Sequence, residues 1–150
     1  MGEKGEFCVS GGSALSLDGK GRMTVPARHR DVLAAVAQDK LTITKHPNRC
    51  LLVFPRPAWE HFRDRILAMG AGGDVMRRLF VGSAVDVEID SGSRVLIAPE
   101  LRTWAGLDKD VMLLGTGQRF ELWDAARLAA YEEEQLAKGD VAQSFIDMGL

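Results

Sequence analysis

Two short segments of the sequence carry the side chains best suited to binding an anion. "DGKGR" occupies residues 18 to 22, and "DSGSR" occupies residues 90 to 94. In each segment an aspartate stands four residues before an arginine. An arginine guanidinium is planar and has several donors, so it can bind a phosphate, or the O6/N7 edge of a guanine, through paired hydrogen bonds. The pattern therefore indicates a binding chemistry centred on Arg22 and Arg94.

The neighbouring residues of these segments have structural interpretations. Gly19 and Gly21 are typical of a tight loop, because glycine adopts a positive φ without steric cost. Asp18 and Asp90 are expected to accept hydrogen bonds from loop amides or to pair with the following arginine. These four residues are therefore assigned to the structure of the loops. Lys20 would add a phosphate contact that has no sequence preference.

The surroundings of the two segments recur, so the sequence contains an internal duplication. Residues 15 to 30 align with residues 87 to 102, with one extra residue before the second proline, and residues 41 to 55 align with residues 111 to 124. The period is about half of the 150 residues. Neither half could bury its apolar strand faces alone. We therefore expect two units that share one core.

Alternating apolar residues predict two hairpins in each unit, with a helix between them. The helices are expected to begin near Pro26 and Pro99, and the second is expected to end at Gly106. The expected hairpins pair residues 15–17 with 23–25 and 41–45 with 51–54 in the first unit, and residues 85–89 with 95–97 and 111–115 with 119–123 in the second.

Further helices are expected between the units and at the C-terminal end. The apolar positions of residues 59 to 69 recur with helical spacing, and Asp74 is expected to cap a second helix after a glycine-rich break. Residues 124 to 138 predict a charged amphipathic helix. The last residues, with Phe145 and Leu150, are expected to form either a short docked helix or a loose tail.

Composition limits the possible classes of protein. With 19 basic and 21 acidic residues the formal net charge is −2, so a nucleic-acid surface would have to be local. Basic residues gather between Lys20 and Arg30, and acidic residues gather at 132 to 134. Cys8 and Cys50 lack metal-binding spacing and favour a reducing compartment. No apolar run approaches membrane-spanning length. We expect a cytoplasmic protein without a membrane partner.

Fragments of catalytic motifs occur without their partners. "HRD" at residues 29 to 31 lacks the glycine-rich loop and the D-F-G of kinases. "GK" at residues 19 and 20 is followed by Gly21, where a P-loop needs serine or threonine. The three histidines have no metal-ligand spacing with the cysteines. We expect no enzymatic activity, no metal, no cofactor and no small-molecule substrate.

Four blocks carry a resemblance to one bacterial family. They are "LDGKGRMTVPARHRDVL", "HPNRCLLVFPRPAWE", "IDSGSRVLIAPELR" and "DVMLLGTGQRFELWD". Their order and spacing resemble the MraZ family, transcriptional regulators of the division and cell-wall gene cluster, from about Val9 onward. Residues 1 to 7 extend before the usual start of that family. The repeated unit resembles the SpoVT/AbrB DNA-binding domain.

The resemblance implies an α+β fold and a DNA-binding function. Two internal repeats would form a tandem AbrB-like swapped-hairpin β-barrel, with additional helices between the repeats and at the C-terminus. The implied protein is cytoplasmic and nucleoid-associated, forms homo-oligomeric rings and binds double-stranded promoter DNA at direct repeats. The implied boundaries are 12–59 for the first repeat, 60–82 for a helical insert, 83–126 for the second repeat and 127–150 for a C-terminal helical tail. The implied DNA-binding residues are Lys20, Arg22, Arg28 and Arg94.

The second loop departs from the D-x-x-G-R pattern of the family. Gly92 comes one place early, and Ser93 takes the glycine position. Serine is strained at positive φ, so we expect the second loop to take another shape and Arg94 to be the weaker candidate. An alternative function is that of an oligomeric assembly protein that does not bind DNA. Its basic segment would pair with the acidic residues 132 to 134 of a neighbouring subunit.

Overall fold

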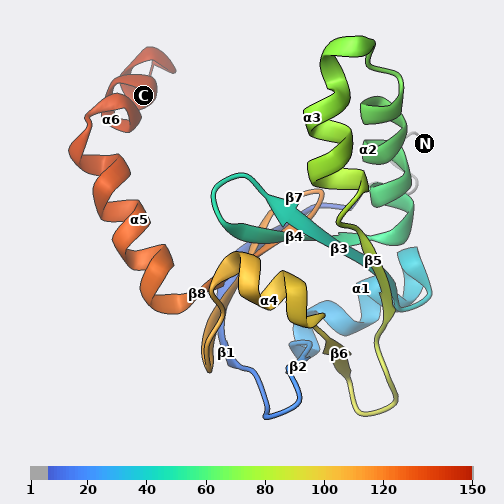
Figure 1. Ribbon diagram of the computed structural model, residues 1–150. Coiled ribbons are helices and arrows are strands. Elements are labelled where there is room, and N and C mark those ends of the chain that lie inside the picture. Colours follow the sequence, from blue (N-terminus) through green and yellow to red (C-terminus); the bar gives the residue numbers. More distant parts are fainter. Residues whose placement is uncertain (1–6, 150) are drawn as a thin grey trace.

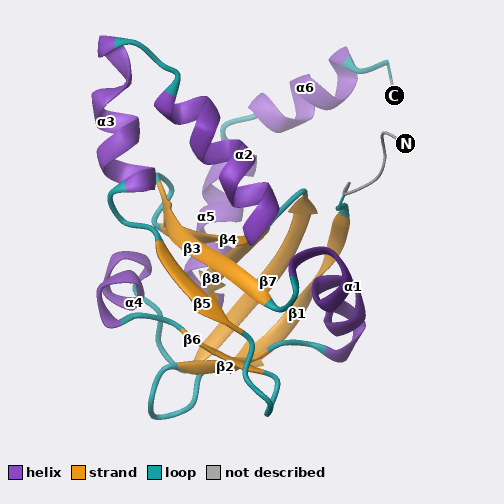
Figure 2. Cartoon of the chain, turned by 90° about the vertical axis from the view of Figure 1, so that its right-hand side faces the viewer, coloured by secondary structure: helices purple, strands orange, loops and turns teal. Residues whose placement is uncertain are grey.

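The computed structural model describes residues 7 to 149 and has a mixed α+β architecture, as predicted (Figure 1). A six-stranded antiparallel sheet has the order β1-β7-β8-β4-β3-β5, and β2 and β6 form a separate two-stranded ribbon. The strands are β1 (Val9–Ser16), β2 (Arg22–Thr24), β3 (Lys40–His46), β4 (Cys50–Pro55), β5 (Val85–Glu88), β6 (Arg94–Leu96), β7 (Asp110–Gly117) and β8 (Phe120–Asp124). Figure 2 shows the ribbon at the end of the molecule away from α2 and α6.

Helices surround the sheet. The α-helices are α1 (Ala27–Ala37), α2 (Arg56–Leu67), α3 (Asp74–Met76), α4 (Pro99–Ala105), α5 (Ala125–Ala137) and α6 (Asp140–Asp147). A 3-10 turn, η1 (Ala71–Gly73), precedes α3, and a π-helical turn, η2 (Arg77–Val81), continues it. Within residues 7 to 149, no helix combines the length and the apolar character that crossing a membrane requires.

Strands of the two repeats pair with each other. β1 pairs with β7, β3 with β5, β4 with β8, and β2 with β6. The hairpins predicted around the two loops are therefore wrong: the first is reduced to a single bridge between Leu17 and Met23, and the second is replaced by pairing of β5 and β6 with the other repeat. The closing hairpins β3–β4 and β7–β8 are confirmed. For the strands that flank the two loops, alternation predicted the buried face but not the partner.

The exchange of strands gives the two repeats one core, as expected. Met23 and Val95 lie opposite each other in the β2–β6 ribbon, and each is 1% exposed. Ile43 from the first repeat and Leu122 from the second are fully buried in the same apolar cluster. Removing either half would therefore expose the inner face of the other.

The helices that follow the ribbon strands begin in the same way. The residues before α1 and α4 are Pro26 and Ala98, with φ/ψ of −58/142° and −58/145°. The extra residue inferred before the second proline is therefore not an insertion. Instead, Pro99 occupies the first helical position, where a missing N–H costs nothing. Helix α4 ends at Gly106 with φ of 60°, as predicted.

Helices α2 and α3, and helices α5 and α6, extend from the sheet as two separate projections (Figure 1). Gly73, and not Asp74, precedes α3, and Asp74 is its first residue. Asp124 caps α5, accepting a hydrogen bond from the backbone N–H of Arg127. The C-terminal residues form a short helix, α6, whose residues are exposed throughout. Leu150 lies outside the described residues.

Candidate nucleic-acid interface

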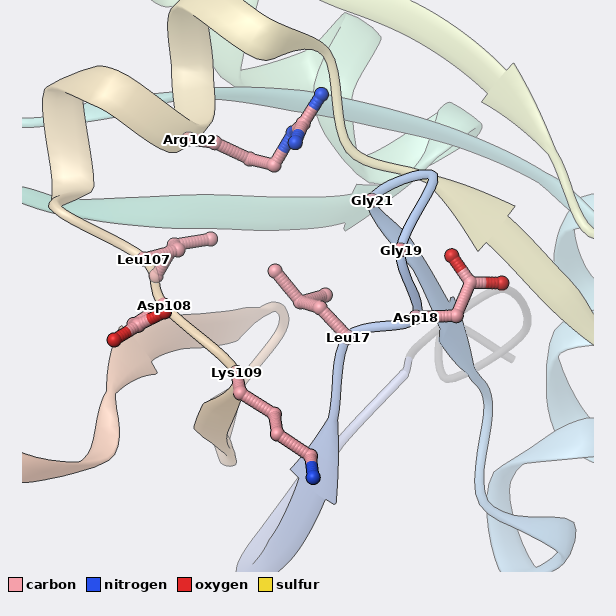
Figure 3. A pocket seen from close by; sticks show the side chains of 8 residues that line it. All are labelled: Leu17, Asp18, Gly19, Gly21, Arg102, Leu107, Asp108 and Lys109. Carbon is pink, nitrogen blue, oxygen red and sulfur yellow. The ribbon is translucent and has the colours of Figure 1, made fainter.

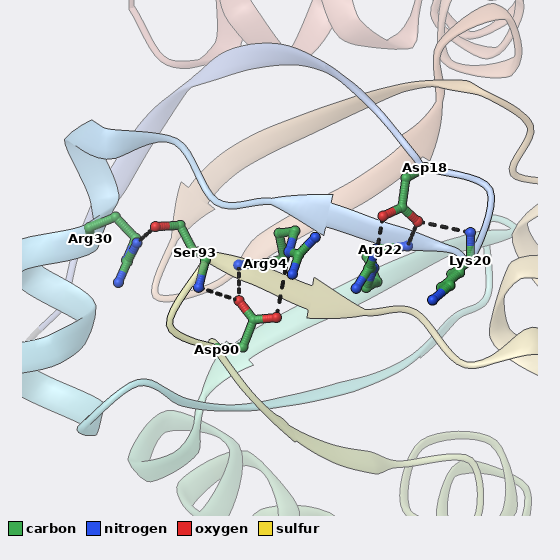
Figure 4. Close-up of polar contacts among 8 residues, drawn as sticks. Asp18, Lys20, Arg22, Arg30, Asp90, Ser93 and Arg94 are labelled. Carbon is green, nitrogen blue, oxygen red and sulfur yellow. Dashed lines mark hydrogen bonds and ion pairs between the residues drawn. The ribbon is translucent and has the colours of Figure 1, made fainter.

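The outer face of the β2–β6 ribbon collects the arginines singled out in the sequence. Arg22 pairs with Leu96, and Thr24 pairs with Arg94, on either side of the buried Met23–Val95 pair. Because side chains alternate along a strand, these four point away from the core. The side chains of Arg22 and Arg94 are 29% and 39% exposed. Two loops 72 positions apart in the sequence thus contribute to one surface (Figure 4).

Each loop is held by its aspartate through the same set of bonds. Asp18 Oδ1 accepts hydrogen bonds from the backbone N–H groups of Lys20 and Arg22, both at 2.9 Å. Asp90 Oδ1 accepts the matching pair from Gly92 and Arg94, also at 2.9 Å. In both loops the first residue donates its N–H to the carbonyl of the fifth, at 2.9 Å. The two loops therefore share one backbone conformation.

That shared conformation corrects the expectation for the second loop. Ser93 has φ of 69°, and Gly21 at the matching position has φ of 83°. Ser93 thus adopts a left-handed backbone conformation, which costs a non-glycine residue about 1–2 kcal/mol. Its Oγ accepts a hydrogen bond from Arg30 Nη1, and its carbonyl accepts one from the N–H of Val25 at 2.7 Å. These contacts with the first repeat offset the strain.

Gly19 does not have the role that the sequence suggests. Its φ lies outside the left-handed region, and a Cβ added there would meet nothing within 4 Å. A Cβ on Gly21 would instead lie 2.7 Å from the guanidinium carbon of Arg102. The requirement for glycine in the first loop is therefore confined to Gly21.

Arg30 and Arg102 support the loops across the repeats, a role that sequence reasoning missed. Each lies four residues after the residue that precedes its helix. Arg30 contacts Ser93 in the second loop, and Arg102 packs on Gly21 in the first while its Nε donates to the carbonyl of Ile97 at 2.9 Å. Arg30 and Arg102 align with each other in the duplicated segments, and this match could have indicated from the sequence that they share a role.

A hollow of about 490 Å³ lies beside the first loop. Leu17 and Leu107 form its apolar part, and the guanidinium of Arg102 reaches from α4 toward Gly21 (Figure 3). Asp18, at the edge of the hollow, turns its carboxylate away from it. The first loop therefore has open space beside it, and the guanidinium of Arg102 lies close to the loop.

The aspartates orient the arginines as well as the loops. Arg22 Nε donates to Asp18 Oδ2 at 2.7 Å, and Arg94 Nε lies 3.6 Å from Asp90 Oδ2, a looser ion pair. The Arg22 backbone N–H, followed by its side chain, lowers the pKa of Asp18 to about 2. The Arg94 backbone N–H is the main cause that lowers the pKa of Asp90. Both carboxylates are therefore ionised at neutral pH.

This pairing leaves donors free for a ligand. Within the described residues, Nη1 and Nη2 of Arg22 form no hydrogen bond. Among residues 7 to 149, Lys20, at the exposed end of the first loop, forms a hydrogen bond only through its backbone. Arg28 is placed differently, because its Nη2 donates to Ser13 Oγ at 2.6 Å and to the carbonyl of Gly12 at 3.2 Å. The structure thus brings Lys20, Arg22 and Arg94 together and ties Arg28 to β1.

The part of the chain that the structure describes contains no group of three or more His, Cys, Asp or Glu side chains arranged to hold a metal ion. Cys50 is fully buried, and burial raises the pKa of its thiol. Cys8 is exposed and forms no disulfide.

Comparison with known proteins identifies the family of the chain. The family model described as "MraZ protein, putative antitoxin-like" matches residues 9–77 and again residues 80–145. The chain belongs to the MraZ family. It is 60% identical over 134 residues to the protein named Transcriptional regulator MraZ of Methylibium petroleiphilum, covering 89% of this chain and 92% of the relative.

Other MraZ relatives are similar over comparable lengths. The protein of the same name from Cupriavidus taiwanensis is 57% identical over 129 residues, which is 86% of this chain and 91% of the relative. That from Leptothrix cholodnii is 55% identical over 142 residues, or 93% and 97% of the two chains. The two matches of the family model, residues 9–77 and 80–145, span both loops and both repeats.

Proposed function

We propose that this chain is a transcriptional regulator that binds double-stranded DNA through the outer face of the β2–β6 ribbon. The observation that carries the proposal is the pairing of β2 with β6, which sets Arg22 and Arg94 on one surface with their guanidinium groups beside aspartates. An oriented guanidinium can donate two parallel hydrogen bonds to a guanine edge. A two-stranded ribbon also fits the major groove. The name shared by the relatives supports a regulatory role.

Each of four cationic residues is assigned a part in binding. Arg22 reads a guanine, and Lys20 contacts a phosphate and so adds affinity without specificity. Arg94 makes a second contact from the other loop. Arg28 is proposed as a flanking phosphate contact, and it would have to leave Ser13 to make it.

The two loops have the same shape but carry different residues. Lys20 in the first corresponds to Gly92 in the second. A surface with unequal halves recognises an asymmetric sequence, whereas equal halves would favour a palindrome. Copies arranged in one orientation would therefore match direct repeats. We propose that the chain forms such a homo-oligomeric ring on promoter repeats of the division and cell-wall gene cluster, in the cytoplasm and associated with the nucleoid.

The proposed architecture follows from the duplication. The repeats at residues 12 to 59 and 83 to 126 would together form the swapped-hairpin barrel of the SpoVT/AbrB type. The cross-repeat pairing of β2 with β6 supports this assignment. Residues 60 to 82 and 127 to 150 would be helical additions to it. Such a chain completes a pseudo-twofold module by itself and has no catalytic function.

The test is binding to direct-repeat promoter DNA measured by fluorescence anisotropy. Arg22→Ala removes a bidentate contact and is expected to weaken binding by about 5- to 150-fold, the equivalent of about 1–3 kcal/mol. Lys138→Ala, which removes an exposed charge just beyond α5, is the matched control and should bind like the wild type. Wild-type affinity in Arg22→Ala would refute the role of Arg22.

The same samples test the alternative of an assembly protein that does not bind DNA. Oligomer mass and DNA affinity are measured in parallel at rising salt. Contacts to phosphates release counterions, so affinity should fall steeply with salt. A stable oligomer without DNA affinity would favour the alternative.

A further inference from the structure

Leu96 is an apolar side chain on the outer face of the β2–β6 ribbon. It is 49% exposed, and among residues 7 to 149 it is the one large hydrophobic residue of a strand that is exposed. The other nine lie in helices or within two residues of a helix end. Single apolar residues are common on protein surfaces, so exposure alone assigns no role to Leu96. Its neighbours on the ribbon do.

The hydrogen bonds of the ribbon place Leu96 directly beside Arg22. The N–H of Ile97 donates to the carbonyl of Gly21 at 2.9 Å, and the next pair in the register is Leu96 with Arg22. Hydrogen-bonded and non-hydrogen-bonded pairs alternate along an antiparallel ladder, so Leu96 and Arg22 form a non-hydrogen-bonded pair. Facing Cβ atoms in such pairs are about 4.5–5.5 Å apart. The two side chains therefore leave the ribbon as close neighbours.

This separation corresponds to neighbouring base pairs of a duplex. Successive bases along a strand are about 3.4 Å apart, so the two residues face positions one or two steps from each other. Asp18 holds Arg22 by its Nε at 2.7 Å, which directs the free end of the guanidinium away from the loop. The C5 methyl of thymine is the apolar group that a base pair presents in the major groove. When Arg22 binds a guanine, Leu96 is thus placed to contact a thymine next to it.

The surroundings of Leu96 favour DNA over an apolar protein surface as the partner. Arg22, Thr24 and Arg94 share the outer face of the ribbon with it. An apolar partner would bury these polar groups without hydrogen bonds, which is unfavourable. A duplex offers acceptors to the guanidinium groups and a methyl group to the leucine.

The other half of the ribbon has a different residue at the equivalent position. Thr24 faces Arg94 as Leu96 faces Arg22. A threonine hydroxyl can hydrogen-bond to any of the bases, whereas a leucine has only apolar contacts to offer. A preference for thymine is therefore expected beside Arg22.

We propose that Leu96 determines specificity by contacting the C5 methyl group of a thymine next to the guanine that Arg22 reads. The guanine and the thymine are then recognised as a unit, which fixes the direction in which each copy lies on an asymmetric site. This proposal rests on the DNA binding of the proposed function and adds a second base to its recognition.

The test compares two direct-repeat promoter duplexes in anisotropy titrations. In one of them every thymine is replaced by 2′-deoxyuridine, which keeps the hydrogen-bonding groups and lacks only the methyl. The wild type should bind the uridine duplex about 4-fold more weakly for each repeat that it contacts, the value of one buried methyl group. Leu96→Ala should bind the thymine duplex more weakly by a similar factor, and should bind both duplexes equally.

Val32→Ala, at an exposed apolar position of α1, is the control and should keep the wild-type preference for the thymine duplex. Circular dichroism verifies the fold of each variant. Equal affinity of the wild type for the two duplexes would overturn the proposal. So would a preference that persists in Leu96→Ala, because the methyl groups would then act through the shape of the DNA.

Single replacements locate the contact and separate it from the role of Arg22. 7-Deazaguanine lacks the N7 acceptor, so the guanine read by Arg22 is the one whose replacement weakens the wild type but not Arg22→Ala. The thymine whose methyl matters should be its neighbour, and a sensitive thymine elsewhere in the repeat would refute the arrangement. Leu96→Ala should keep the sensitivity to 7-deazaguanine. A wild type that binds neither duplex would instead overturn the proposed function itself.

Discussion

Replacing Gly21 with alanine tests how the two repeats brace the ribbon loops. Gly21 has φ of 83°, and a Cβ there would lie 2.7 Å from the guanidinium carbon and from Nε of Arg102. The left-handed backbone alone costs a non-glycine residue about 1–2 kcal/mol. Displacing the guanidinium also breaks the Arg102 Nε bond to the Ile97 carbonyl, at a further cost of about 1–2 kcal/mol. Gly21→Ala is therefore expected to lower the free energy of unfolding by about 2–4 kcal/mol.

Gly19→Ala is the matched control in the same loop. Its φ is not left-handed, and its Cβ would meet nothing within 4 Å, so the stability should change by less than about 0.5 kcal/mol. Urea unfolding followed by circular dichroism, at one fixed protein concentration, measures both variants. In thermal unfolding, Gly21→Ala should lower Tm by roughly 4–16 °C for a chain of this size.

A double-mutant cycle isolates the contact with Arg102. Arg102→Ala removes the group that the new Cβ would strike, so the two changes together should cost less than the sum of their separate costs. Equal destabilisation by Gly19→Ala and Gly21→Ala, or strict additivity of Gly21→Ala with Arg102→Ala, would refute the inferred support of the first loop by Arg102.

Three further predictions concern the core, the loops and the second arginine. Met23→Ala, in the 1%-exposed centre of the ribbon, should cost about 2–5 kcal/mol in urea unfolding. The pKa of Asp18 is lowered from 3.8 to about 2, so its contribution to stability is present above pH 3.8 and lost as pH falls toward 2. Thermal melts should therefore show a gap between the wild type and Asp18→Asn at neutral pH that closes by about pH 2, and a gap independent of pH would contradict the stabilising role of the ionised carboxylate. Arg94→Ala should weaken binding to direct-repeat DNA in anisotropy titrations by about 5- to 150-fold, and unchanged affinity would confine DNA binding to the first loop.

The sequence predicted the elements of the fold better than their partners. Period-two alternation identified the segments that became β2 and β6, because it depends only on which face is buried. It could not show that β2 pairs with β6, since Met23 would be equally buried in a hairpin with its own repeat. The closing hairpin β3–β4 was predictable because its turn is short and local.

Side-chain contacts across the repeats explain the other differences. Ser93 looked incompatible with positive φ, and only the structure shows Arg30 bound to its hydroxyl. Arg28 looked like a free cation beside the loop, yet it is bound to Ser13 in β1. Each of these contacts joins residues that are distant in the sequence, so spacing and composition carry little information about them.

The difference between Lys20 and Gly92 makes the asymmetry of the ribbon testable. Both residues donate their backbone N–H to the loop aspartate at 2.9 Å, so a side chain at either position would project from an equivalent place. Gly92 does not need positive φ, and a Cβ there would lie 3.1 Å from Arg94 Nε, which forms no hydrogen bond within the described residues and can shift by a few tenths of an ångström. The loop should therefore accept Gly92→Lys with little loss of stability.

The lysine introduced by Gly92→Lys would give the second loop the phosphate contact assigned to the first. Each added phosphate contact should steepen the dependence of log affinity on log salt by about 0.9. Affinity for unrelated duplex DNA should rise with it, because phosphate contacts carry no sequence information. Anisotropy titrations across a salt series measure both effects, with Ser91→Lys at a neighbouring exposed position as the control for charge alone. Equal slopes for Gly92→Lys and the wild type would mean that the second loop does not face the DNA backbone.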